Sequence, residues 1–200
     1  MDRGAKNEQI IQMITVACVL KSGGDYDAEY VRRLKEGVDR NLDGHRFVCL
    51  SDVAVPCERI PLKHDFPGWW AKLELFYLEG PVLFFDLDTV IDGDLEAIAN
   101  YPHRFTAVDD FYRPRRLQSN VMAWADATPW RHLIEVYRNN PRAAGRSHQK
   151  WIEPHVKPIQ FFQDLFPGDF VSYKATKNRR GASVICYHGK PRPHQTGWAV

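Results

Sequence analysis

The most constraining feature of the sequence is an apolar, strand-like run that leads directly into two aspartates. Residues 81–85 read PVLFF, and Asp86, Leu87 and Asp88 follow at once. In an open α/β sheet, ligands bind beyond the carboxyl ends of the strands. Side chains at positions i and i+2 of an extended chain point the same way. The run therefore predicts a buried strand with two carboxylates converging in a binding crevice at its end.

Two carboxylates that converge on one point repel each other unless a cation lies between them. A hard divalent ion such as Mn²⁺ or Mg²⁺ relieves that repulsion and can also bridge a diphosphate. The alternative is a solvated turn, because Asp is common in turns. An isolated Asp-X-Asp arises often by chance, so both interpretations stay open at this point.

Segments with strand and helix patterns alternate through the first half of the chain. This alternation predicts an α/β fold with a central, mostly parallel mixed sheet that is flanked by helices. A dinucleotide fold has no support, because no GxGxxG follows the first strand. We expect a polar extension at residues 1–12 and one domain at residues 13–200. The expected strands are residues 13–20, 45–50, 81–85, 104–108, 118–124, 170–173 and 183–187, and the expected helices are residues 26–42, 69–78, 93–99, 128–138 and 147–152.

Composition narrows the class of protein. With 44% apolar and 26% charged residues, the 200-residue chain is typical of a folded globular domain. Its net charge of +2 is too mild to indicate a nucleic-acid-binding protein. Three of the four cysteines, Cys18, Cys49 and Cys186, lie in or beside apolar runs, which favours buried free thiols in a reduced compartment. Neither a leader pattern nor a transmembrane stretch of roughly 18 apolar residues is present, so we expect a cytoplasmic location.

A second polar motif follows a late strand. Residues 183–187, SVICY, lead into His188, Gly189 and Lys190. Neutral imidazole is a common metal ligand, a lysine offers a point charge to a phosphate, and glycine allows close approach of the backbone. The alternative is an ordinary polar loop near the C-terminus.

Together these motifs resemble the retaining glycosyltransferases of family 8, which include glycogenin and the bacterial lipopolysaccharide galactosyltransferases. The stretches that carry the resemblance are ITVACVL, WWAKLELFYL, PVLFFDLDTVIDGDL, SNVMAW and YHGKPRPH, in the same order and rough spacing over nearly the whole chain. The resemblance implies a GT-A fold, a Rossmann-like single domain. It also implies transfer of a hexose from a UDP-sugar to a glycan, lipid-linked or protein acceptor.

The resemblance implies roles for individual positions. Asp86, Asp88 and His188 would hold the Mn²⁺ or Mg²⁺, and Lys190 would contact the diphosphate. The first strand and its loop, residues 17–25, would cradle the base and ribose. The implied donor-binding positions are Ala17, Val19, Lys72, Asp86, Leu87, Asp88, Gln118, Asn120, His188, Gly189 and Lys190. The implied catalytic positions are Gln149, Asp109 and Lys190, with Asp110 an equal alternative to Asp109.

The sequence departs from the family pattern at two places. Residues 118–122 read QSNVM where the family usually has Asn-Ser-Gly-Val-Met, so the amide is lengthened or displaced. His148 precedes Gln149 where the family often has Asp-Gln, and the missing Asp would grip hydroxyls of the donor sugar. The identity of the sugar and the presence of activity therefore stay open.

Other residues and other classes of protein remain candidates. Trp69 and Trp70 follow a turn, so one of them is expected at the cleft. The basic run at residues 113–116 is either a solvated loop, a lid over the diphosphate or a contact for an anionic acceptor. A phosphatase of the haloacid-dehalogenase kind also places Asp-X-Asp after an apolar strand. A nucleotide-sugar-binding protein without turnover is the other alternative.

Overall fold

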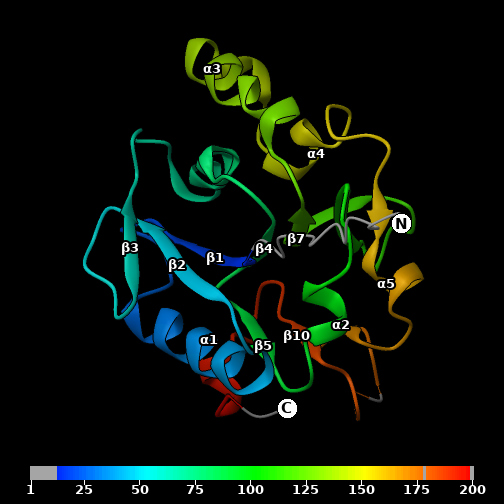
Figure 1. Ribbon diagram of the computed structural model, residues 1–200. Coiled ribbons are helices and arrows are strands. Elements are labelled where there is room, and N and C mark those ends of the chain that lie inside the picture. The colour runs from blue at the N-terminus through cyan, green and yellow to red at the C-terminus, as the bar shows by residue number, and fades with distance from the viewer. Residues whose placement is uncertain (1–12, 178, 199–200) are drawn as a thin grey trace, which may run out of the picture.

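The computed structural model describes residues 13–177 and 179–198 (Figure 1). The expected N-terminal extension at residues 1–12 lies outside the described residues. The strands are β1 (Thr15–Leu20), β2 (Arg46–Ser51), β3 (Glu58–Pro61), β4 (Val82–Phe85), β5 (Thr89–Ile91), β6 (Phe105–Asp109), β7 (Leu117–Trp124), β8 (Gln160–Phe161), β9 (Phe170–Ser172) and β10 (Val184–Cys186). The α-helices are α1 (Ala28–Asn41), α2 (Glu96–Ala99), α3 (His132–Asn139), α4 (His148–Ile152) and α5 (Phe162–Leu165), and the 3₁₀ helices are η1 (Gly68–Tyr77), η2 (Thr128–Trp130), η3 (Pro141–Ala144) and η4 (Pro193–Thr196).

Seven strands form the central sheet, in the order β3-β2-β1-β4-β7-β6-β8. Strands β3, β2, β1 and β4 are parallel to one another, and β7 runs antiparallel between β4 and β6. The expected mixed, mostly parallel sheet flanked by helices is confirmed. Because β1 and β4 are parallel neighbours, their carboxyl ends meet at the same edge of the sheet, and this edge is where ligands bind in open α/β folds.

Alternating residues of the central strands fill two separate cores. In β4, Leu83 and Phe85 pack into the core beneath α1, while Val82 and Phe84 pack into the core beneath η1 and α3. Side chains of a strand point alternately to its two faces, so a strand covered on both faces must be apolar at every position. This is why PVLFF is continuous rather than alternating. Figure 1 shows α1 on one side of the sheet and α3 on the other.

A small second sheet, in the order β5-β10-β9, adjoins the core beneath α1. Helix α1 packs closely against it, since a Cβ added at Gly37 would lie 3.1 Å from the Cβ of Ile91. The chain then leaves β10 and returns beside α1, where Tyr30 contacts the ring of Trp198 at 4.8 Å between centroids. This return brings the C-terminal segment, drawn in red in Figure 1, next to the first third of the chain.

The structure differs from the sequence expectations mainly in short elements. Residues 68–77 form a 3₁₀ helix, and the helix expected at residues 128–138 is divided at Arg131 into η2 and α3. Strands β3, β5 and β8 were not expected. Cys18, Cys49 and Cys186 are buried and, like Cys57, unpaired. Within the described part of the chain, no helix is long and apolar enough to cross a membrane.

Candidate active site

A cleft of about 690 Å³ opens at the carboxyl ends of β1 and β4. Its walls come from the loop after β1, the start of η1, the turn after β4, the start of β7, the start of α4 and the segment after β10. The lining residues are Val19, Lys21, Gly24, Asp25, Tyr26, Gly68, Trp69, Lys72, Asp86, Leu87, Asp88, Gln118, Ser119, Asn120, Arg146, Ser147, His148, Gln149, Tyr187, His188, Gly189 and Arg192.

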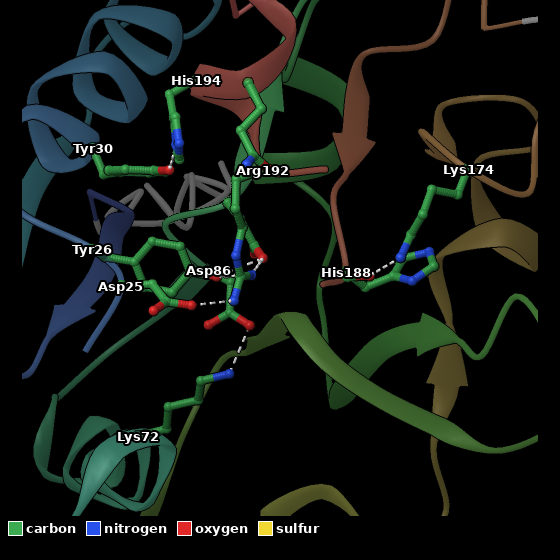
Figure 2. Close-up of polar contacts among 11 residues, drawn as sticks. Asp25, Tyr26, Tyr30, Lys72, Asp86, Lys174, His188, Arg192 and His194 are labelled. Atoms are coloured by element: carbon green, nitrogen blue, oxygen red, sulfur yellow. Dashed lines mark hydrogen bonds and ion pairs between the residues drawn. The ribbon is translucent and has the colours of Figure 1, made fainter. Parts of the chain in front are cut away.

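Asp86 lies on the cleft floor, and its carboxylate is paired with a lysine. Lys72 of η1 donates to its Oδ2 at 2.7 Å (Figure 2). The backbone amide of Asp86 donates to the carbonyl of Asn120 at 2.7 Å, which ties the end of β4 to β7. Burial raises the pKa of the Asp86 carboxyl, and the Lys72 ammonium opposes that rise. The lysine expected before the aspartate pair is therefore at the site.

Asp88 lies beside it and is paired with a different cation. The Tyr26 hydroxyl donates to Asp88 Oδ2 at 2.7 Å, and Arg192 Nη1 donates to the same oxygen at 2.8 Å. Burial, with repulsion from Asp86, raises the pKa of Asp88 to about 6. Burial beside Asp88 also raises the pKa of the Tyr26 hydroxyl, which therefore stays protonated as a donor.

Arg192, which the sequence analysis did not identify, lines the cleft and contacts both Asp88 and Asp25. Its guanidinium lies 4.8 Å from the centre of the Tyr26 ring, and its Nη2 donates to Asp25 Oδ2 at 3.0 Å. Its Nε is buried without a partner. Lys190, the cation that the family resemblance placed on the diphosphate, is exposed and is not among the residues that line the cleft. The only signal in the sequence that could have identified Arg192 is its position two residues after Lys190, in the same polar motif.

His188 borders the cleft but faces away from the two carboxylates. Its Nε2 lies 2.6 Å from the Ser172 hydroxyl, and its ring stacks against Phe111 at 5.8 Å between centroids. Figure 2 shows the imidazole on the side of Lys174, whose ammonium donates to the His188 carbonyl. Burial lowers the pKa of this imidazole.

The predicted metal set is thus assembled only in part. Asp86 and Asp88 fit a hard divalent ion by donor type. With His188 on Ser172 and Arg192 on Asp88, however, no group of three possible ligands converges among the described residues. In this arrangement Lys72 and Arg192 supply the positive charge that the two carboxylates require.

Beside the two carboxylates, the cleft lining also carries buried polar atoms that lack partners. They are Gln118 Oε1, Asn120 Nδ2 and both ring nitrogens of His148. His148 is only 3% exposed, and burial together with the nearby Lys72 charge lowers its pKa well below the usual range. A neutral imidazole offers one donor and one acceptor. Leaving such atoms unpaired costs about 1–3 kcal/mol each, so a ligand hydroxyl that reached them would be favoured over an apolar group.

The remaining predicted residues divide into two groups. Val19, Leu87, Gln149 and Gly189 line the cleft. Ala17 is fully buried within β1 and lies outside the cleft lining.

The acidic pair at the end of β6, Asp109 and Asp110, also lies outside the cleft lining. Asp109 Oδ1 accepts from the Arg115 amide at 2.6 Å, and Asp110 Oδ2 accepts from Arg113 Nη2 at 2.7 Å. Of the two tryptophans, Trp69 lines the cleft and is 58% exposed, whereas Trp70 is buried.

The protein has an open α/β fold with a cleft and an acidic pair at the strand ends. Comparison with solved structures identifies the class of this fold. The sequence itself matches no known family model and no curated protein. The glycosyltransferase GlyE from Streptococcus pneumoniae TIGR4 aligns with a TM-score of 0.66 at 13% identity, over 90% of this chain and 56% of that chain. The galactosyltransferase LgtC, solved with donor and acceptor sugar analogues, aligns with a TM-score of 0.65 at 13% identity, over 90% and 88%. The bifunctional glycosyltransferase WbbM aligns with a TM-score of 0.60 at 13% identity, over 95% and 48%.

The fold is therefore that of the GT-A glycosyltransferases. This chain spans about half the length of GlyE and of WbbM, and most of the length of LgtC.

Proposed function

We propose that the protein is a glycosyltransferase that moves a hexose from a UDP-sugar to a glycan, lipid-linked or protein acceptor, with retention at the anomeric carbon. The observation that carries the proposal is the division of one cleft into two chemistries. Asp86 and Asp88, with Lys72 and Arg192, form a charged floor. Unpaired neutral groups, above all the His148 imidazole, line the same cleft beside this floor. A nucleotide-sugar has the same division, with a charged diphosphate beside a neutral sugar ring.

Lys72 and Arg192 are the residues of the chain suited to the diphosphate. Arg192 is the more versatile of the two, because a guanidinium has five N–H donors in a fixed fork that matches phosphate oxygens. Its contact with Asp25 involves an aspartate whose side chain is 69% exposed. Arg192 could therefore gain phosphate contacts at the cost of a weak outer ion pair. Positive charge aimed at the leaving diphosphate is the electrostatic contribution that glycosyl transfer needs most.

A divalent cation at Asp86 and Asp88 is part of the proposal. When bound, it would neutralise charge on the diphosphate. A cation on Asp88 Oδ2 would displace Arg192, which donates to that oxygen, and the released guanidinium would then be available to the donor. In this view, the cation and Arg192 alternate at Asp88.

Gln149 borders the cleft on the proposed sugar side, and its chemistry favours one of the two mechanisms that retain the anomeric configuration. A double displacement needs a nucleophile beneath the sugar, and a neutral amide is a poor nucleophile. The neighbours of Gln149 are His148 and Lys150, so neither offers a carboxylate. We therefore favour front-face attack, in which the acceptor enters on the side that the diphosphate leaves and a phosphate oxygen takes its proton.

The alternative functions receive less support from the site. A phosphatase of the haloacid-dehalogenase kind would use Asp109 and Asp110 to complete a metal site, and these two residues are hydrogen-bonded to Arg115 and Arg113 outside the cleft lining. A binding protein without turnover remains the second candidate, because His148 replaces the Asp that the family resemblance leads one to expect.

Calorimetry of UDP binding, with and without Mn²⁺, tests the proposal. The wild type should bind UDP more tightly when Mn²⁺ is present. Asp88→Ala should lose most of that increment, because one carboxylate cannot hold a bridged ion alone. If the increment is unchanged in Asp88→Ala, the assignment of the carboxylates is wrong. If the wild type does not bind UDP at all, the assignment of the cleft is wrong.

A further inference from the structure

A second hollow adjoins the cleft and shares one residue with it. The hollow has a volume of about 190 Å³, and Gln149 lines both it and the cleft. Its other lining residues are Arg113, Arg116, Leu117, Lys150 and Glu153. They come from the loop before β7, from the start of β7, and from α4 and the residue that follows it. Figure 1 shows α4 and β7 beside each other. A single water needs only about 10–15 Å³ of such space, so the hollow takes a group many times larger.

The hollow has an excess of positive charge, and carboxylates hold its two arginines, Arg113 and Arg116, in place. Arg113 donates to the buried Asp110, and Arg116 Nε lies 2.9 Å from Oε1 of Glu153. Each contact uses one edge of the guanidinium and orients the rest. Within the described residues, the Nη atoms of Arg116 and the ammonium of Lys150 have no protein partner. Oriented donors of this kind suit an oxyanion, because less conformational freedom is lost on binding.

We propose that this hollow is the acceptor subsite and that it takes an acceptor bearing a carboxylate or a phosphate. The inference rests on the proposed function, since it assigns the second substrate of the same reaction. Gln149 lines both spaces, so an acceptor held in the hollow would lie next to the sugar side of the cleft. Arg116 and Lys150 would hold the anionic group, and Arg113 would supply further positive charge at the rim.

Matched small sugars test the inference without knowledge of the natural acceptor. Methyl glucuronide and methyl glucoside share one ring and differ by a carboxylate, and glucose 6-phosphate supplies the phosphate arm. Titration of each into the protein saturated with UDP, followed by NMR, should show at least roughly tenfold tighter binding of an anionic sugar than of the neutral one. Whichever of the two anionic sugars binds more tightly indicates whether the acceptor carries a carboxylate or a phosphate. Equal binding of all three, or no binding of any, would overturn the inference.

Lys150→Gln is the first variant, because Lys150 is exposed and its loss leaves no buried partner. It should weaken binding of the anionic sugar roughly tenfold and leave UDP binding unchanged. The matched control is Lys35→Gln, on α1, where Lys35 pairs with Asp39. A paired variant, Arg116→Gln with Glu153→Gln, removes the second cation without leaving a buried carboxylate alone.

The results separate the two proposals. An anionic preference that survives both variants overturns the inference, while intact UDP binding shows that the proposed function still stands. Failure of the wild type to bind UDP would instead contradict the proposed function.

Discussion

Arg192 Nη1 lies 2.8 Å from Asp88 Oδ2, so the C-terminal segment supplies the cation for an aspartate at the end of β4. The Asp88 side chain in this contact is 8% exposed, and the Arg192 side chain is 19% exposed. A guanidinium in this position is protected from solvent yet lies on the cleft, so it can exchange a carboxylate for a phosphate.

The first prediction concerns this guanidinium. Arg192→Gln should weaken UDP binding roughly tenfold to a hundredfold, because a charge-assisted hydrogen bond contributes about 1.5–3 kcal/mol. Binding of uridine, which lacks the phosphates, should change little. Lys190→Gln is the matched control and should retain affinity for UDP. Isothermal calorimetry checks all three, and a larger loss in Lys190→Gln than in Arg192→Gln would show that the family-based assignment of Lys190 is correct.

The second prediction concerns the unpaired imidazole. His148→Leu should raise the free energy of unfolding of the ligand-free protein by about 1 kcal/mol, since a buried polar group without a partner is removed. This corresponds to roughly 2–4 °C in Tm for a chain of this size. The same variant should bind UDP normally and a UDP-sugar at least roughly tenfold more weakly. Equal losses for UDP and UDP-sugar would contradict a role on the sugar side of the cleft.

The third prediction concerns acid stability and a different histidine. His103 is 4% exposed, and burial lowers its pKa from 6.5 to about 4. Its Nδ1 lies 2.8 Å from the Thr106 hydroxyl and its Nε2 lies 2.8 Å from the Ile98 carbonyl, so the neutral ring is fully paired. The unfolded chain binds a proton at a higher pH than the folded one. Folded stability is therefore fully present above about pH 6.5 and is lost as the pH falls toward 4, by about 3 kcal/mol.

Urea unfolding from pH 7 to pH 4 measures this loss. His103→Gln should show a pH dependence that is shallower than that of the wild type by about 3 kcal/mol over the same range, even if its stability at pH 7 is lower. Parallel curves for the two proteins would show that His103 does not titrate as described.

The fourth prediction concerns stereochemistry. If the acceptor attacks on the face that the diphosphate leaves, an α-linked donor gives an α-linked product. Gln149→Ala should then slow turnover only moderately, because the amide orients or stabilises and forms no covalent bond, whereas Asp86→Ala should be far more damaging. Proton NMR of the linkage formed is the measurement. A β-linked product would refute both the mechanism and the family resemblance that suggested it.

Much of the fold could be predicted because its strongest elements are strongly patterned. The strand at residues 82–85 is apolar on both faces because two cores cover it, and that pattern is visible without a structure. Strand β3, with the sequence ERIP, is exposed or half-exposed along its length, so it has no hydrophobic pattern to detect. It forms because β2 offers a parallel edge, which is a tertiary effect.

The site was less predictable because the approach of distant segments determines it. Asp86 could be found from its position after an apolar strand, and Lys72 from the family resemblance, which implies a lysine on the helix before the aspartate pair. The pairing of Tyr26 with Arg192 depends on the chain returning beside α1 after β10, and no local pattern encodes that return. The same return determines which of two nearby cations, Lys190 or Arg192, reaches the cleft.

Release of UDP from nucleotide-sugars tests whether the cleft transfers a sugar from a nucleotide donor. UDP-glucose and UDP-galactose are incubated with the protein and Mn²⁺, with p-nitrophenyl phosphate as a parallel substrate. We expect at least slow release of UDP from one of the donors, lost in Asp86→Ala, and no preference for the phosphate ester. Hydrolysis of the ester without release of UDP would instead identify a phosphatase. Tight UDP binding with no release from either donor would identify a binding protein without turnover.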